Sequence, residues 1–206
     1  MSIPDDIQTF ATDDRRLRIA LREETRASHE ALDRAMIPFA MDDKEGYRAF
    51  LGVHGSILPA IERAMEKNGI AQDLPDWSAR TRREALARDL EELGAGSEPA
   101  IGEDQMPDLS TKAARFGAAY VLEGSRLGAK MLLRQVPDNG RHFPTNFLRH
   151  GESSRLWPAF VSMLDEADSL GISHAVAISA ARHIFGIYER AAKARISAGN
   201  FVTVHE

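Results

Sequence analysis

Apolar residues recur at spacings of three and four along most of the chain, and alternating apolar and polar residues are nearly absent. The first spacing is that of a helix with one buried face, whereas alternation is typical of a strand. The pattern therefore predicts an all-α fold, a single-domain helical bundle. Helical segments are expected at residues 14–35, 44–69, 78–94, 111–136, 154–171 and 173–198, with a short element within 141–151.

Two of these segments carry local signals of their own. Pro59 lies inside the second segment and should kink or divide it, because proline removes a backbone donor and its ring crowds the preceding turn. Ser78 is expected to cap the third segment, which Gly94 should close. A chain of 206 residues is one domain by length. We expect that domain to span residues 14–198, between flexible ends at 1–13 and 199–206.

Composition excludes several classes of protein. There is no cysteine, hence no disulfide frame, thiolate zinc site or cysteine nucleophile. A net charge of -5 disfavours nucleic acid as a partner, although Arg15, Arg16, Arg18, Arg22 and Arg26 form a basic cluster that suits an anionic ligand or a solvated helix face. No run approaches the ~20 apolar residues of a membrane span, and the N-terminus lacks the pattern of a signal peptide. These features predict a soluble, cytoplasmic protein with no membrane partner.

The segment 111–136 contains an unusual stretch, YVLEGSRLGAK, at residues 120–130. Gly117, Gly124 and Gly128 fall near one stripe of the expected helix, and each glycine costs a helix interior roughly 1 kcal/mol relative to alanine. Such glycines allow either tight packing of another helix or the close approach of a flat ligand to the backbone. The spacing alone leaves both readings open.

The first helical segment contains a histidine in a position that requires explanation. Leu21, Thr25, His29 and Leu32 are spaced four, four and three apart, which predicts that His29 lies on the buried stripe. Asp33, one turn later, can accept a hydrogen bond from one ring nitrogen and leave the other for a metal. A satisfied core histidine is the alternative interpretation.

Other metal chemistries are disfavoured, because the chain has no His-x-x-x-His and no Glu-x-x-His pair. One protein ligand points to a metal that brings its own equatorial ligands, such as haem. The distal glycines would admit the flat macrocycle, and His29 would lie on its other face. Arg22 precedes His29 by seven residues, or roughly 10 Å along the helix, and its guanidinium suits a haem propionate.

Two segments resemble one known family, the bacterial haem oxygenases, including those encoded with bacterial phytochromes. LREETRASHEALD, at residues 21–33, is similar to the family's proximal helix, and YVLEGSRLGAK is similar to its distal helix. The two motifs stand in the family's order, about 90 residues apart. The resemblance implies a haem oxygenase fold in which haem b, as substrate and cofactor, lies between a proximal and a distal helix.

The resemblance also implies a role for individual residues. His29 matches the proximal iron ligand and Asp33 its hydrogen-bonding partner, while Gly124, Ser125 and Gly128 match the distal catalytic segment. Two departures stand out: Ala129 replaces a frequent glycine, and Ser125 stands where animal members carry an aspartate. The predicted cofactor-binding residues are Arg22, Thr25, Asp33 and Tyr120, and Phe143 and Phe147 are candidate pocket walls.

The implied reaction is oxidative cleavage of haem to biliverdin, carbon monoxide and ferrous iron, with oxygen and electrons from an external donor such as a ferredoxin or a reductase. A non-catalytic haem carrier or sensor on the same scaffold is the alternative. A cofactor-free helical interaction protein, with His29 buried against Asp33, is a third possibility.

Overall fold

The computed structural model describes residues 16–96, 101–137 and 143–199. Every regular element in these ranges is a helix, so the predicted all-α fold is confirmed. The predicted flexible ends at 1–13 and, apart from Gly199, at 199–206 lie outside the described residues. The elements are α1 (Leu17–Met36), α2 (Lys44–Lys67), α3 (Ile70–Asp73), α4 (Trp77–Arg80), α5 (Arg83–Glu92), the 3-10 turn η1 (Glu103–Gln105), α6 (Lys112–Leu132), α7 (Asn146–Arg149), α8 (Leu156–Ser169) and α9 (His174–Ala198).

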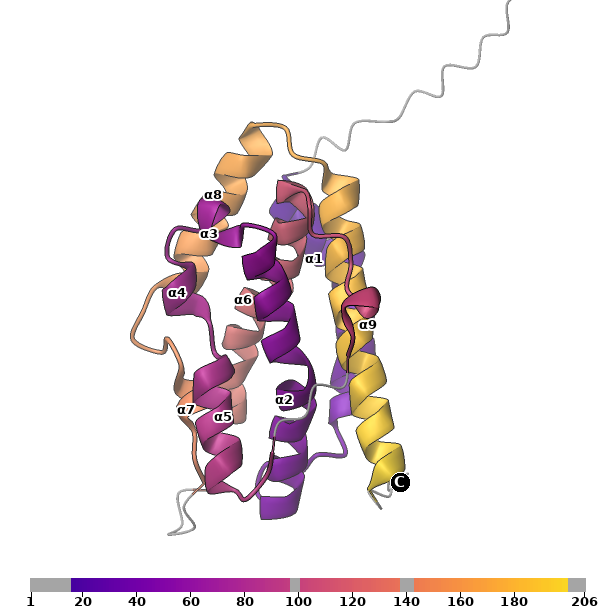
Figure 1. Ribbon diagram of the computed structural model, residues 1–206, viewed down its shortest axis with the longest axis vertical. Helices are drawn as coiled ribbons and strands as arrows, with labels where there is room; N and C mark the ends of the chain where they lie inside the picture. The colour runs from indigo at the N-terminus through magenta and orange to yellow at the C-terminus, as the bar shows by residue number, and fades with distance from the viewer. Residues whose placement is uncertain (1–15, 97–100, 138–142, 200–206) are drawn as a thin grey trace, which may run out of the picture.

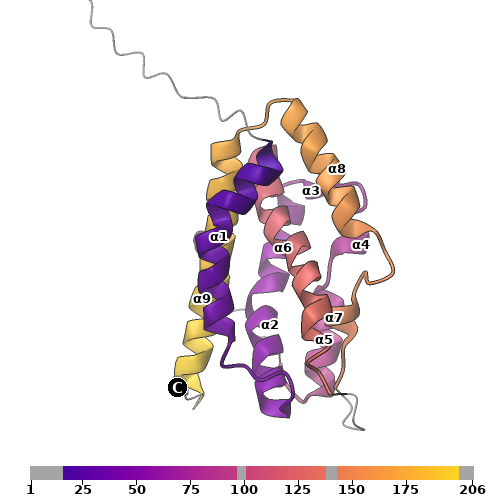
Figure 2. The same cartoon turned by 180° about the vertical axis from the view of Figure 1, so that it is seen from behind.

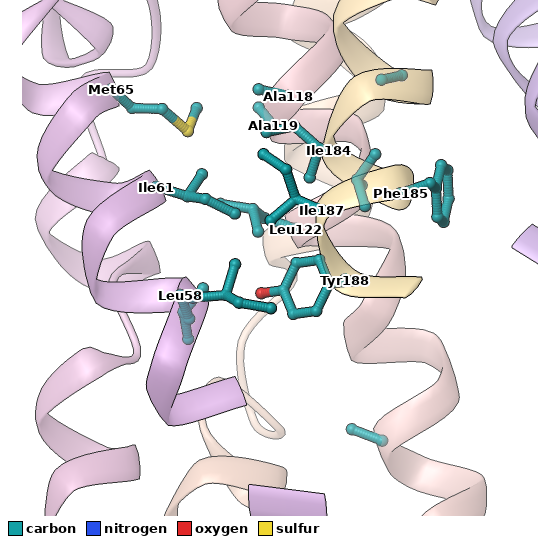
Figure 3. Close-up of a cluster of buried hydrophobic side chains, with 14 of the residues drawn as sticks. Leu58, Ile61, Met65, Ala118, Ala119, Leu122, Ile184, Phe185, Ile187 and Tyr188 are labelled. Carbon is teal, nitrogen blue, oxygen red and sulfur yellow. The ribbon is translucent and has the colours of Figure 1, made fainter. Parts of the chain in front are cut away.

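The long C-terminal helix α9 packs against α1, α2 and α6. Helices α1 and α6 both pack extensively on α9, and α2 packs on α5 and α9 (Figures 1 and 2). The core between α2, α6 and α9 is filled by aliphatic and aromatic side chains, with Leu58 and Ile61 facing Leu122 and Ile187 (Figure 3). Burial of this apolar surface is the main stabilising term of the fold.

Helix α1 and helix α6 run in the same direction but are joined through α9 rather than through each other. Figure 2 shows both descending from the same end of the molecule, with α9 beside α1. Helices α1 and α6 make at most marginal contact with one another. This arrangement places the two sequence motifs opposite one another.

Most helix boundaries follow the sequence signals. Asp43 and Thr111 cap α2 and α6 by accepting hydrogen bonds from Gly46 and Ala114, at 2.9 Å and 3.2 Å. The backbone N–H of Leu17 at the start of α1 has a distant partner: it donates to Asp168 Oδ2 in α8, 2.8 Å away. None of the helices within the described ranges is both long and apolar enough to cross a membrane.

The predicted helix 78–94 is wrong as a single element. The chain forms α4 and α5, which are separated at Thr81–Arg82, and Ser78 lies inside α4 instead of capping it. The break has a physical cause: the backbone N–H of Arg82 donates to the buried carboxylate of Glu62, at 2.7 Å, in place of a helical carbonyl. The sequence also did not predict α3 or η1.

Pro59 does not divide its segment, because α2 continues through it as one helix of 24 residues. The alternative expectation, a kink at Pro59, stays a prediction.

Candidate functional site

The proximal side of the site consists of His29 and Asp33 on α1. The ring Nδ1 of His29 lies 2.9 Å from Asp33 Oδ2, which is the predicted pairing one helical turn apart. Since the carboxylate engages Nδ1, Nε2 is the ring nitrogen left for a ligand. The ring of Phe185 in α9 meets the His29 ring edge to face, with centroids 5.6 Å apart, and supports its orientation.

The prediction that His29 is buried on the core stripe is wrong. Its side chain is 61% exposed, whereas Thr25 and Leu21, one and two turns earlier, are buried. The cause is the packing of α1, which rests on α9 and α8 and touches α6 only marginally, so the C-terminal half of α1 is covered on one side only. The interpretation of His29 as a satisfied core residue is excluded by the same observation.

Thr25 lies deeper than the other predicted contacts. It is 2% exposed, and its hydroxyl donates to the Leu21 carbonyl at 2.7 Å within α1. The hydroxyl is therefore committed to its own helix. Contact of Thr25 with a cofactor stays a prediction, and the structure favours a packing role.

The structure separates the glycines of α6 into two kinds. A Cβ at Gly117 would collide with the backbone carbonyl of Ala177, so this glycine permits the close crossing of α6 and α9. At Gly124 an added Cβ would meet only Trp157, at 3.8 Å, and at Gly128 it would meet nothing within 4 Å. Helix packing thus explains Gly117, whereas the backbone at Gly124 and Gly128 is open, and the approach of a flat ligand there stays a prediction.

Exposed apolar side chains flank this open backbone. Leu127 and Met131 on α6 are 49% and 66% exposed, and Ile37 at the end of α1 is 75% exposed. Beyond them a pocket of about 410 Å³ joins the two helix ends; it is lined by Ile37, Phe39, Ala40, Met41, Asp42 and Gln135. The surface between the C-terminal ends of α1 and α6 therefore combines exposed apolar side chains with a pocket that also has polar lining from Asp42 and Gln135.

The opposite end of this surface carries a cation and a phenol. Arg22 on α1 is exposed and acts electrostatically on Tyr120 of α6, so these two predicted cofactor-binding residues lie near one another. Burial raises the pKa of the Tyr120 hydroxyl, and the charge of Arg22 partly offsets that effect. The Tyr120 ring is also supported by Trp157, with centroids 5.9 Å apart. A neutral phenol can donate its O–H to a carboxylate, and a guanidinium beside it can form an ion pair with the same carboxylate.

A buried ionic cluster behind α6 was not predicted. Arg80 is 1% exposed and its Nη1 lies 2.6 Å from Glu123 Oε2, while both oxygens of Asp76 accept from the same guanidinium. Arg126 also binds Glu123, at 3.1 Å, and donates to the backbone carbonyls of Arg80 and His150. The sequence signal was present in the arginines of the segment 80–83, but Glu123, the buried partner of Arg80, lies 43 residues away.

A second unpredicted group surrounds His54 of α2. Its ring lies against the rings of Phe50, Phe147 and Tyr188, with centroids 4.8 to 5.4 Å apart, and its buried Nδ1 has no hydrogen-bond partner in the structure. Burial lowers the pKa of His54 to about 3, and the charge of Arg82 acts in the same direction. His54 is therefore a neutral imidazole at physiological pH.

The two aromatic candidates for the pocket wall lie in the interior. Phe147 packs beneath the guanidinium of Arg82, 4.9 Å from the ring centroid, and Phe143 meets Tyr47 edge to face. Both are buried, and the contacts of Phe147 bring it close to the underside of α6. Their role as walls of a ligand pocket stays a prediction.

The donor set fits haem better than a bare metal ion. Over the described residues, no three His, Asp or Glu side chains gather in a way that could hold a metal. The site has one exposed imidazole and, on the helix opposite, open glycine backbone. Apolar side chains lie at one end and a guanidinium–phenol pair at the other. These features match a flat, amphipathic iron complex that has two carboxylates.

Comparisons with known proteins bear on the family of this chain. The family model described as "Heme oxygenase" matches residues 15–194. A heme oxygenase of Xanthomonas campestris pv. campestris is 29% identical over 158 residues, which cover 74% of this chain and 93% of that protein. The crystal structures of the NO- and CO-bound heme oxygenase from Neisseria meningitidis match with a TM-score of 0.72 at 25% identity, over 88% of this chain and 92% of that one. The family model spans nearly the whole folded part of the molecule, so the chain belongs to the haem oxygenase family.

Proposed function

We propose that this protein binds haem b between α1 and α6 and cleaves it oxidatively to biliverdin, carbon monoxide and ferrous iron. The observation that carries the proposal is the pairing of two exposed features on helices that face one another: the His29–Asp33 pair on α1 and the open backbone at Gly124 and Gly128 on α6. Bound haem would supply the iron that activates oxygen and the porphyrin edge that is oxidised.

The residues of the chain bind and orient. Asp33 holds the His29 ring through Nδ1 and keeps Nε2 free for iron, while Phe185 limits rotation of the ring. Gly124 and Gly128 let the backbone approach the opposite face, and the side chain of any larger residue at 128 would occupy that space. Arg22 and Tyr120 pair with the propionates and fix which edge of the macrocycle points toward them.

Ser125 has a narrower role than its position suggests. Its Oγ donates to the Leu122 carbonyl at 2.7 Å and accepts from Arg82 at 2.9 Å, so its proton is already committed within the protein. We therefore assign proton delivery to water ordered by the distal backbone, with Ser125 as an acceptor for one such water.

The test is turnover of the haem-loaded protein in air with ascorbate, or with a ferredoxin and its reductase. We expect the Soret band to decay while biliverdin appears. A stable Soret band with no biliverdin would instead identify a haem carrier or sensor, and failure to bind hemin at micromolar concentration would identify a cofactor-free protein.

Two substitutions test the faces separately. His29→Ala should abolish turnover, because it removes the proximal ligand. Gly128→Leu should block the distal face, and Lys130→Leu is its matched control, since residue 130 is exposed two positions, or about 200°, around the same helix. Normal biliverdin formation by Gly128→Leu would contradict the steric role of Gly128.

The electron donor is proposed to be an acidic ferredoxin or a reductase that approaches the basic residues near Arg22. Arg18 and Arg26 are exposed on the same helix as Arg22. Reduction should then slow as ionic strength rises, and a reduction rate insensitive to salt would contradict this assignment. The cytoplasmic location expected from the sequence stays a prediction.

A further inference from the structure

The second half of α6 is held in place differently from the first half. Ala114, Phe116 and Ala118 in the first half are buried against the core, whereas Ser125, Leu127 and Gly128 are exposed. Two glycines further weaken this part of the helix. Ala129 is the buried apolar residue of the segment 124–129, so apolar packing fixes this segment only in part.

Polar bonds from the α4–α5 connection supply that support at two points. The first is Arg80 at the end of α4, which binds Glu123; Arg126, on α6 itself, binds the same carboxylate. The second is Arg82, whose Nη2 donates to the Leu122 carbonyl at 3.1 Å and to Ser125 Oγ at 2.9 Å, on either side of Glu123. Ser125 lies directly after Gly124, so Arg82 reaches α6 at the start of the open backbone.

Arg82 is itself rigidly held. It is 3% exposed, its backbone N–H is bound to Glu62, and its guanidinium lies 4.9 Å from the ring centroid of Phe147. The two acceptors of Nη2 are neutral: this buried cation donates to a backbone carbonyl and a hydroxyl of α6 rather than to a carboxylate. Charged donors bind neutral acceptors more strongly than neutral donors do.

We propose that Arg82 is a positioning residue of the distal helix, which fixes Leu122 and Ser125 and thereby sets the height of the Gly124–Gly128 backbone over the haem face. The haem part of this statement rests on the proposed function; the anchoring of residues 124–129 does not.

The anchoring is tested on the haem-free protein by amide hydrogen exchange. Arg82→Met removes both donors while it keeps an apolar stem on Phe147, and should accelerate exchange of residues 124–129 about tenfold. Arg82→Lys retains the charge with a single donor group and should restore protection in part. If Arg82→Met does not fold, as judged by circular dichroism, the intermediate effect of Arg82→Lys carries the test.

Arg115→Met is the matched control. Like Arg82, Arg115 is a largely buried arginine that bonds to backbone carbonyls. It lies at the N-terminal end of α6, where it binds Asp73 at 2.6 Å and the carbonyls of Leu109 and Ser110. This variant should leave exchange at 124–129 unchanged. Equal acceleration in both variants, or none in Arg82→Met, would overturn the proposal.

A second test isolates the link through Ser125. In a Ser125→Ala background, Arg82→Met should accelerate exchange less than in the wild type, because one of the two bonds is already absent. Full additivity of the two substitutions would show that Arg82 does not act through Ser125.

The haem-loaded protein gives an independent readout. In the carbon monoxide complex of the reduced protein, Arg82→Met should shift the C–O stretching frequency and change the ratio of biliverdin isomers, while Arg115→Met should change neither. If wild-type protein binds no hemin, the proposed function fails, yet the exchange experiment still decides whether Arg82 anchors α6. If hemin binds but both readouts are identical in Arg82→Met and wild type, the positioning role fails alone.

Discussion

At the scale of single residues, His54 shows how an interior position changes the chemistry of a side chain. The imidazole is enclosed by Phe50, Phe147 and Tyr188, and the guanidinium of Arg82 is close by. Both the aromatic surroundings and the neighbouring cation oppose protonation. Folding therefore requires a neutral ring where the unfolded chain has an ordinary histidine.

This difference predicts how stability depends on pH. The pKa of His54 falls from 6.5 in a free histidine to about 3 in the folded protein, so between these values the unfolded state binds more protons and the free energy of unfolding drops as the pH falls. The slope from this one group reaches about 1.4 kcal/mol per pH unit. Urea denaturation of wild type and His54→Phe, compared at pH 7 and pH 5, should show a smaller acid-induced loss in the variant.

His150 provides the check on this interpretation. Burial, followed by the charge of Arg126, also lowers its pKa, so it contributes to acid sensitivity in the same direction. The relevant quantity is therefore the difference between wild type and His54→Phe. Parallel pH curves for the two proteins would show that His54 is not the group responsible.

At the scale of the helix, replacing a glycine of α6 with alanine should have opposite effects on the free energy of unfolding at positions 117 and 128. Gly117→Ala should lower the free energy of unfolding by about 1–3 kcal/mol, because its Cβ would collide with the Ala177 carbonyl and push α6 away from α9. Gly128→Ala should raise it by up to about 1 kcal/mol in the haem-free protein, since a Cβ there meets nothing within 4 Å and alanine favours the helix. Denaturant titrations of both variants measure the pair.

A stabilising Gly117→Ala, or a strongly destabilising Gly128→Ala, would show that the two glycines are not distinguished in the way described. Gly124→Ala should fall between them, because its Cβ would make an ordinary contact with Trp157 at 3.8 Å.

Helix boundaries show where sequence reasoning succeeds and where it stops. The caps of α2, α6 and α9 are local: a side chain binds a backbone N–H three residues on, so the pattern is visible in the sequence. The break between α4 and α5 is not local, because it depends on Glu62, some 20 residues earlier, as the acceptor of the Arg82 N–H. Propensity alone favours a continuous helix there.

At the scale of the whole molecule, haem should act as a structural partner of α1 and α6. These helices touch only marginally, so a ligand bound to both adds contacts that the protein alone does not make. At a free hemin concentration of 100 times Kd, the free energy of unfolding should rise by about 2.7 kcal/mol, with a corresponding rise in Tm. Thermal unfolding followed by circular dichroism measures the effect.

The control is a histidine elsewhere on the surface. His29→Ala should lose most of the hemin-induced rise in Tm. His183→Ala should keep it, since His183 is exposed and its ring pairs with the Gln105 carbonyl. An equal loss in both variants would indicate non-specific hemin binding.

The candidate site divides in the same way between what the sequence predicts and what it does not. The family and the all-α fold were predicted correctly, and so was the contact of His29 with Asp33, because these two residues share a helix. The exposure of His29 was not, since it depends on how far α6 lies from α1. Arg82 was missed for a related reason: its acceptors on α6 lie about 40 residues away in the sequence.

The crossing of α6 over α9 at Gly117 affects which ligands can fit beside the far end of α6. Gly117 and Gly128 are 11 positions apart, or about 16 Å along α6, so a tilt of about 5° at the crossing displaces the far end by about 1.4 Å. That displacement is a large fraction of the thickness of an aromatic ring. The size of ligand that the protein accepts thus depends on the angle at a helix crossing that is distant from the ligand. A single methyl group added at Gly117 would change that angle.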